Sequence, residues 1–226
     1  DEAYARKILN DISYFRLIKA YSLNLKQKNG CYNQDTTFEE IVSLYLFNAN
    51  FRQLVFPQIE KVEINVRCRV SNYFAEQYGA LGYLQCENFA DDIYHSEFLN
   101  DMRLEIGRNS KSPFVRNFRE HYEGGKLPIY AIVELFSFGT LSKFYKNMIN
   151  KDKKAVAKTF GVGYTYFESW LESIAYVRNI CAHYGRLYNA KLTKTPILYK
   201  EYTQSGISNN RIYGVLLCLK HLLITD

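Results

Sequence analysis

The residues best suited to chemistry lie within one stretch, Arg178-Asn179-Ile180-Cys181-Ala182-His183. An imidazole titrates near neutrality and can both accept and donate a proton. A guanidinium stays charged and binds phosphate oxygens through paired N–H donors. Together the two groups could move a proton and stabilise negative charge that develops on phosphate oxygens. His183 is therefore the candidate acid/base group, Arg178 the candidate phosphate clamp and Asn179 the candidate orienting residue.

Each of these residues also has a structural interpretation. His183 could be a buried histidine bonded to a carbonyl oxygen. Arg178 could be the ion-pair partner of Glu172 or Glu168. Asn179 could make a capping or interhelical hydrogen bond. These alternatives stay open at the level of the sequence.

The candidate residues are predicted to lie on one helix, at about residues 164–184. At about 100° per residue, one apolar stripe is formed by Trp170, Ile174, Val177, Cys181 and Tyr184. The opposite side carries Glu172, Ala175, Asn179, Ala182 and His183. Arg178 lies on the flank, from which its long side chain could swing toward His183. We expect the stripe, Tyr184 included, to pack in the core and the opposite side to remain open.

The surrounding sequence carries a resemblance to a known family. Ser169-Trp170-Leu171 precedes the motif and Tyr184-Gly185-Arg186-Leu187-Tyr188-Asn189 follows it. Upstream lie Leu127-Pro128-Ile129-Tyr130 and Glu134-Leu135-Phe136-Ser137-Phe138-Gly139-Thr140-Leu141-Ser142. With the Arg-x4-His motif, these segments resemble the bacterial Abi-like abortive-infection family, a phage-defence group with a HEPN fold. The similarity extends from Tyr14-Phe15-Arg16-Leu17 to Asn189.

The resemblance implies a metal-independent endoribonuclease that needs no cofactor. In HEPN ribonucleases the motif His acts with the 2′-hydroxyl, and the motif Arg holds the scissile phosphate. RNA is then the substrate, a small non-coding RNA is a further possible partner, and a homodimer or another HEPN–HEPN pair forms a composite site. Two other functions remain open: a non-catalytic HEPN module that binds RNA or a protein, and an interaction protein that senses a phage component through its aromatic surface.

Basic residues precede the motif and one follows it. Lysines cluster at Lys143, Lys146, Lys151, Lys153 and Lys154. Arg186 reaches the same side as the motif if the helix continues past Gly185. Such residues can follow an RNA backbone, and we predict that they do, although a solvated lysine-rich surface is the alternative.

Composition limits the class of protein. A chain of 226 residues with 47% hydrophobic content can form one substantial core, so we expect a single domain over residues 1–226. The net charge of +6 is mildly basic and permits nucleic-acid binding. Five scattered cysteines form neither a disulfide framework nor a zinc motif, which favours a reducing cytoplasm. Four histidines show no metal-binding spacing, and no apolar run is long enough to span a membrane.

Helical periodicity recurs throughout the chain and strand alternation is nowhere sustained. A first helix is expected to fade near Asn29-Gly30. Thr37 and Glu40 form a possible capping box for a helix that either kinks or restarts at Pro57. Further helices are predicted at 58–78, 92–107, 113–122, 128–136, 140–148, 151–160, 164–184 and 212–223. The sequence therefore predicts an all-α, HEPN-like helical bundle with additional helices.

Overall fold

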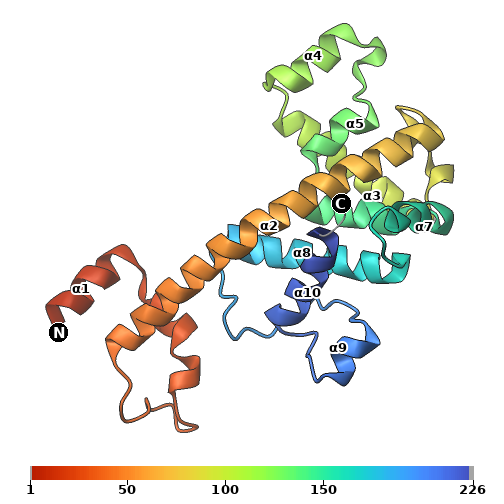
Figure 1. Ribbon diagram of the computed structural model, residues 1–226. Helices are drawn as coiled ribbons and strands as arrows, with labels where there is room; N and C mark the ends of the chain where they lie inside the picture. Colours follow the sequence, from red (N-terminus) through yellow and green to blue (C-terminus); the bar gives the residue numbers. More distant parts are fainter. Residues whose placement is uncertain (1, 224–226) are drawn as a thin grey trace.

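The computed structural model describes residues 2–223 and contains helices but no β-strand within that range (Figure 1). The all-α prediction is confirmed. The HEPN-like arrangement of the helices remains a prediction.

The longest element is α2, Phe38–Tyr78, along which most of the other helices are arranged (Figure 1). It begins where the Thr37 side chain accepts a hydrogen bond of 3.1 Å from the Glu40 backbone N–H, as the capping box predicted. It ends at Gly79, whose φ of 76° only glycine adopts readily. The helix neither stops nor restarts at Pro57, because buried Val55 and Ile59 anchor it in the core on both sides of the proline.

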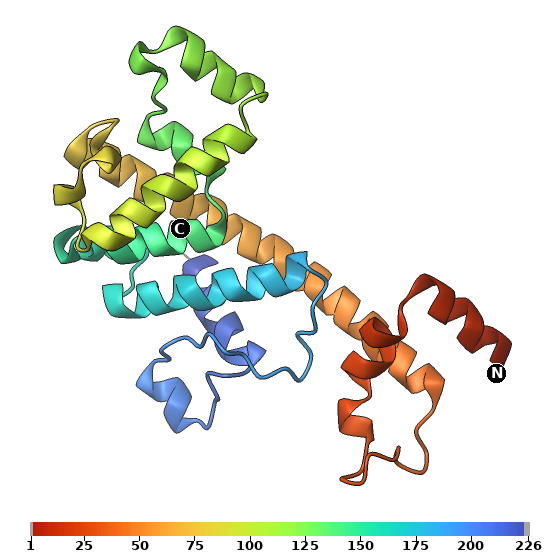
Figure 2. The ribbon, with the colours of Figure 1, turned by 180° about the vertical axis from the view of Figure 1, so that it is seen from behind.

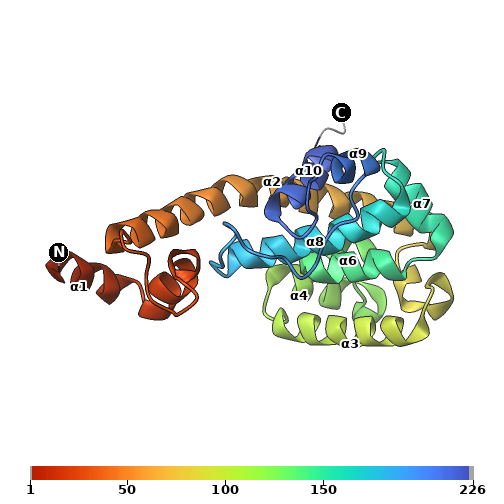
Figure 3. The same ribbon diagram turned by 90° about the horizontal axis from the view of Figure 1, so that it is seen from below.

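The main core lies between α2 and three helices that pack on it: α6 (Phe138–Asn147), α8 (Tyr164–Ala182) and α10 (Ile212–Leu223). Figures 2 and 3 show α8 running alongside α6, with α10 against both α8 and α2. Trp170, Phe167 and Leu171 of α8 are completely buried. The candidate motif therefore lies on a helix held from several sides, which fixes the position of its backbone.

A second, smaller hydrophobic cluster lies at the other end of α2. It consists of Leu17, Ile18, Tyr21, Ile41 and Val42. Figure 3 shows the N-terminal segment packed there, away from the main group of helices. The predicted first helix is interrupted: α1 ends at Asp11 and a short π-helical turn follows at Phe15–Lys19. Phe15, the first residue of this turn, is 75% exposed.

The other helices are α3 (Asp92–Arg108), α4 (Pro113–His121), α5 (Ile129–Ile132), α7 (Asn150–Lys158) and the short α9 (Lys200–Gln204). The remaining predicted helices are present with shifted boundaries, the one at 128–136 as a short α-helix followed by a 3-10 turn, and α9 was not predicted. Ser137 rather than Thr140 caps α6, since its hydroxyl accepts a hydrogen bond of 3.0 Å from the Thr140 N–H. Within residues 2–223, none of the helices combines the length and apolar character needed to cross a bilayer.

We predict that Pro57→Ala stabilises the protein by up to about 3 kcal/mol, since alanine restores a helical N–H and removes the ring from the helix interior. Pro57 is exposed, so the substitution disturbs little packing. Urea unfolding followed by circular dichroism measures the change. Lys61→Ala, an exposed site on the same helix, should shift the free energy of unfolding by less than about 0.5 kcal/mol. A destabilised Pro57→Ala variant would contradict the prediction.

Candidate functional site

The motif helix ends at Ala182, and a compact turn follows it. The Gly185 N–H donates to the Ile180 carbonyl at 2.7 Å, and the Tyr184 N–H donates to the Cys181 carbonyl at 3.1 Å. These two bonds form a Schellman motif with Tyr184 in the left-handed position, at φ 59°. A side chain at Gly185 would meet Ile180 at 2.8 Å, so the turn requires glycine there. The helix therefore does not continue to Arg186, and that part of the prediction is wrong.

The predicted apolar stripe is confirmed except at its end. Trp170, Ile174 and Val177 are fully buried, and Cys181 is 7% exposed. Tyr184, expected to pack in the core, is 66% exposed, because the left-handed turn directs it off the stripe. Ala175 was expected on the open side but is buried, because the helices around α8 cover more than one face.

Arg178 forms its ion pair with a residue that the sequence did not suggest. Its Nε lies 3.4 Å from Oε2 of Glu63 on α2. The two partners considered from the sequence are engaged elsewhere: Glu172 pairs with Lys194 at 2.6 Å and Glu168 with Lys153 at 3.0 Å. The hydrogen bond from Lys194, more than its charge, lowers the pKa of Glu172. The sequence did not identify Glu63 as the partner of Arg178, because the two residues are distant in sequence and meet only where α2 packs on α8.

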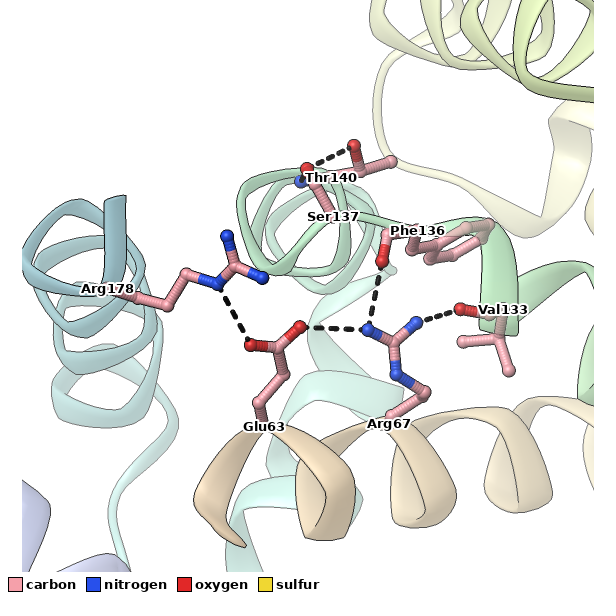
Figure 4. Close-up of polar contacts among 7 residues, drawn as sticks. All are labelled: Glu63, Arg67, Val133, Phe136, Ser137, Thr140 and Arg178. Carbon is pink, nitrogen blue, oxygen red and sulfur yellow. Dashed lines mark hydrogen bonds and ion pairs between the residues drawn. The ribbon is translucent and has the colours of Figure 1, made fainter. Parts of the chain in front are cut away.

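Glu63 is shared between two guanidinium groups (Figure 4). Its Oε1 accepts a hydrogen bond of 2.9 Å from Arg67. Arg67 also donates to the carbonyl oxygens of Val133 and Phe136. The side chains of Glu63 and Arg67 are only 13% and 11% exposed. Glu63 is thus held rigidly, and its ion pair with Arg67, one turn along α2, is part of a larger network.

The terminal nitrogens of Arg178 remain available. Figure 4 shows them extending beyond the ion pair, and within residues 2–223 no hydrogen bond engages them. The guanidinium also lies 5.8 Å from the ring centroid of Phe56. It borders a pocket of about 240 Å³ lined by Phe56, Glu60, Glu63, Ile64, Arg67 and Arg178. The Glu63 carboxylate therefore lies 3.4 Å from the inner nitrogen of Arg178, a charge contact without a hydrogen bond, while the outer N–H groups can meet an anion.

Asn179 and His183 are both exposed. The buried-histidine interpretation of His183 is therefore wrong. In the described part of the chain neither side chain has a hydrogen-bond partner. No contact joins His183 to Arg178 there either, since positions five residues apart on a helix point about 140° away from each other. One copy of the chain thus presents the two motif groups on different sides of α8.

Two α2 residues that sequence reasoning missed fix the loop after the motif. Asn48 is completely buried, and its Oδ1 accepts hydrogen bonds from the N–H groups of Leu187 (2.8 Å) and Tyr188 (2.9 Å). Its Nδ2 donates to the Tyr21 hydroxyl at 2.7 Å and to the Gly185 carbonyl at 3.3 Å. Arg52 donates to that same carbonyl at 3.0 Å. A polar residue on the apolar face of a predicted helix was the available signal, because such a residue needs partners.

The predicted RNA-binding lysines divide into two groups. Four are exposed: Lys143, Lys146, Lys151 and Lys154. Lys153 is only 9% exposed, and its ammonium donates to the Lys146 carbonyl (3.2 Å) and Glu168 (3.0 Å). Lys153 therefore makes its contacts within the protein, unlike the four exposed lysines, and its contact with RNA stays a prediction. Lys154 lies 5.5 Å from the Tyr164 ring centroid at the start of α8, and His183 lies about 28 Å along the helix axis from that residue.

Arg186 lies in the loop, close enough to Tyr21 for its charge to favour the phenolate. Burial dominates and raises the pKa of Tyr21, although the charge and hydrogen bond of Arg52 and the charge of Arg186 act in the opposite direction. Within residues 2–223, no group of three or more His, Cys, Asp or Glu side chains could hold a metal ion.

We predict that Glu63→Gln lowers the free energy of unfolding by about 2–4 kcal/mol, because two guanidinium groups lose the carboxylate between them. Glu60→Gln is the matched control: Glu60 borders the same pocket but is exposed, so its substitution should cost less than about 0.5 kcal/mol. Chemical denaturation measures both. Equal effects would show that the Glu63 network does not hold the helices together.

We predict that Asn48→Ala costs at least about 2 kcal/mol, since the buried N–H groups of Leu187 and Tyr188 lose their acceptor. Hydrogen exchange in the segment 185–188 should accelerate as well. The exposed Asn50 of the same helix provides the control, and Asn50→Ala should leave both quantities nearly unchanged. Unaltered exchange in Asn48→Ala would refute the anchoring role.

Comparison with known proteins supports the resemblance carried by the motif. The family model described as Abi-like protein matches residues 7–189, which include the N-terminal segment, α2 to α8 and the loop that follows. Comparison with curated proteins and with solved structures gave no match. Because the family model covers most of the 226 residues, the chain belongs to the Abi-like protein family.

Proposed function

We propose that this protein is an endoribonuclease of phage defence that cleaves RNA without a metal ion. The observation that carries the proposal is the state of Arg178: its guanidinium is ion-paired with Glu63 through Nε, while within residues 2–223 its terminal N–H groups make no hydrogen bond where the side chain lines a pocket. His183, five residues further on, is exposed at the end of the same helix. Membership of the Abi-like family supports a role in abortive infection.

The proposed reaction uses the RNA itself as the nucleophile. His183 accepts the proton of a 2′-hydroxyl, and the oxygen forms a bond to the neighbouring phosphorus. The bond from phosphorus to the 5′-oxygen breaks, and His183 returns the proton to that leaving oxygen. The products are a 2′,3′-cyclic phosphate and a free 5′-hydroxyl. Arg178 stabilises the charge on the non-bridging oxygens, and Asn179 orients the imidazole or the RNA.

The angular separation of the motif residues favours a site shared by two copies. Within one copy, Arg178 faces α2, whereas His183 lies about 140° around the helix. Pairing two motif helices would bring the Arg178 of one copy toward the His183 of the other. We therefore include a homodimer, or a pair with another HEPN chain, in the proposal.

Basic residues outside the motif would extend the path of the RNA. Arg186 lies beside the motif, whereas Lys143, Lys146, Lys151 and Lys154 are exposed on α6 and α7. The distance from Lys154 to the motif corresponds to several nucleotides, so these lysines would hold flanking RNA rather than the scissile phosphate. A bound small non-coding RNA would use the same charges.

We predict that the purified protein cleaves labelled single-stranded RNA in EDTA and leaves cyclic phosphate ends. His183→Ala and Arg178→Ala should each reduce the rate at least about 100-fold, because each removes a group that acts in the transition state. His121→Ala is the matched control, since His121 is also an exposed histidine, and it should cleave at the wild-type rate.

Binding assays on the same variants separate the enzyme from its principal rival. An enzyme whose His183→Ala variant binds RNA but does not cleave it fits the proposal. A wild-type protein that binds RNA tightly and never cleaves it would instead be a non-catalytic binding module. Cleavage that survives in both motif variants would rule out the proposed residue roles.

A further inference from the structure

We propose that Tyr184 is a stacking platform for a nucleobase that flanks the cleavage point. The inference rests on the proposed function in that RNA is the ligand, but it does not require that the RNA be cleaved. Tyr184 combines a left-handed backbone conformation with an exposed side chain, which is unusual for a tyrosine with only a structural role.

The backbone of Tyr184 is the first observation. It occupies the left-handed position of the Schellman motif, at φ 59°. Glycine, and sometimes asparagine, is the usual residue there, because a side chain with a Cβ is sterically strained in that conformation. The turn would form more readily with glycine. A tyrosine at this position therefore opposes local stability, and strained residues of this kind gather at functional sites.

The side chain provides the second observation. Tyr184 is 66% exposed, and within the described chain its ring is not packed against another aromatic ring. By contrast Tyr188, further along the same loop, has its ring 5.4 Å from that of Phe47. The Tyr184 ring also follows His183 directly in sequence. An exposed aromatic ring is thus carried by the residue next in sequence to the candidate acid/base group.

Positive charge surrounds this ring. The Arg16 guanidinium lies 5.6 Å from the Tyr184 ring centroid. Arg52 and Tyr184 both line a second, open pocket of about 510 Å³, together with Phe56, Pro57, Cys181 and Ala182. Aromatic faces flanked by arginines are the usual platform for single-stranded nucleic acid, where bases stack and phosphates meet the charges.

The loop that carries Tyr184 is held rigidly, which makes the ring a preorganised partner. The Gly185 carbonyl accepts from both Asn48 and Arg52, and Asn48 also accepts from the N–H groups of Leu187 and Tyr188. Little conformational entropy then remains to be lost when a base stacks on the ring. Since every base has a π-face, the contact should be tolerant of base identity.

The test measures RNA binding and thermal stability in the same variants. The probe is a fluorescein-labelled 12-nucleotide 2′-O-methyl RNA, which cannot be cleaved through a 2′-hydroxyl, together with a series of copies that each carry one abasic position. Tyr184→Gly should weaken binding of the intact probe by about 5- to 150-fold, the range for loss of one stacked base. Its Tm should be unchanged or higher, because glycine relieves the left-handed strain.

Two further variants serve as controls. Tyr184→Phe keeps the ring and should bind within about twofold of wild type, since stacking does not need the hydroxyl. Tyr130→Ala removes an exposed tyrosine on α5 and should not change binding. In the abasic series, removal of one particular base should weaken binding by the wild-type protein. Removal of the same base should not weaken binding by Tyr184→Gly any further, because the base and Tyr184 are the two partners of one contact.

The outcomes are distinct. Wild-type affinity in Tyr184→Gly, or an unchanged abasic pattern, overturns the stacking role. A drop in Tm that accompanies the loss of binding overturns it as well, because it would identify a structural tyrosine. No binding by the wild-type protein removes both the stacking role and the nuclease. Binding that follows the predicted pattern without any cleavage of unmodified RNA upholds the platform and refutes only the nuclease.

Discussion

The contact on which the motif depends is the Glu63 carboxylate between two guanidinium groups. It joins α2 to α8 and, through Arg67, to the chain ahead of α6. A desolvated ion pair adds little net stability, because removing charges from water offsets much of their attraction. Its value here is geometric: Glu63 takes the Nε of Arg178 and leaves the terminal nitrogens free. The Glu63 carboxylate also neutralises the charge of Arg178 when no ligand is bound, so the guanidinium can line the pocket without an anion.

The elements of the fold could be predicted largely from periodicity and caps, but not the contacts between them. The α8 stripe from Trp170 to Cys181 was visible because burial repeats with the helical period. The continuity of α2 through Pro57 could not be predicted from the sequence, since tertiary packing overrode the local helix-breaking effect of the proline. The Arg178–Glu63 pair and the Asn48 anchor were hidden for another reason. Both join segments distant in sequence, and a single sequence contains no record of which helices meet.

The end of α8 shows how one backbone event redirects several side chains. The helix stops at Ala182 because the chain turns left-handed at Tyr184 and brings Gly185 against Ile180. A helical extrapolation therefore placed Tyr184 in the core and Arg186 on the motif face, and both positions changed together. His183 became the capping residue of the helix, where neighbouring turns cannot cover it. The exposure that a reactive imidazole needs thus follows from the way in which the helix ends.

The N-terminal segment buries little surface in comparison with the main core. Helix α1 has no buried residue, and the cluster lies at the end of α2 away from the main group of helices. Segments with so little buried surface open at a lower free energy than the whole protein. Tyr21 and Arg16, which meet Asn48 and Tyr184, both belong to that part. Detachment of the N-terminal segment would therefore remove the contacts of Tyr21 with Asn48 and of Arg16 with Tyr184. A partner that binds this segment would then change the surroundings of the loop at the C-terminal end of α8.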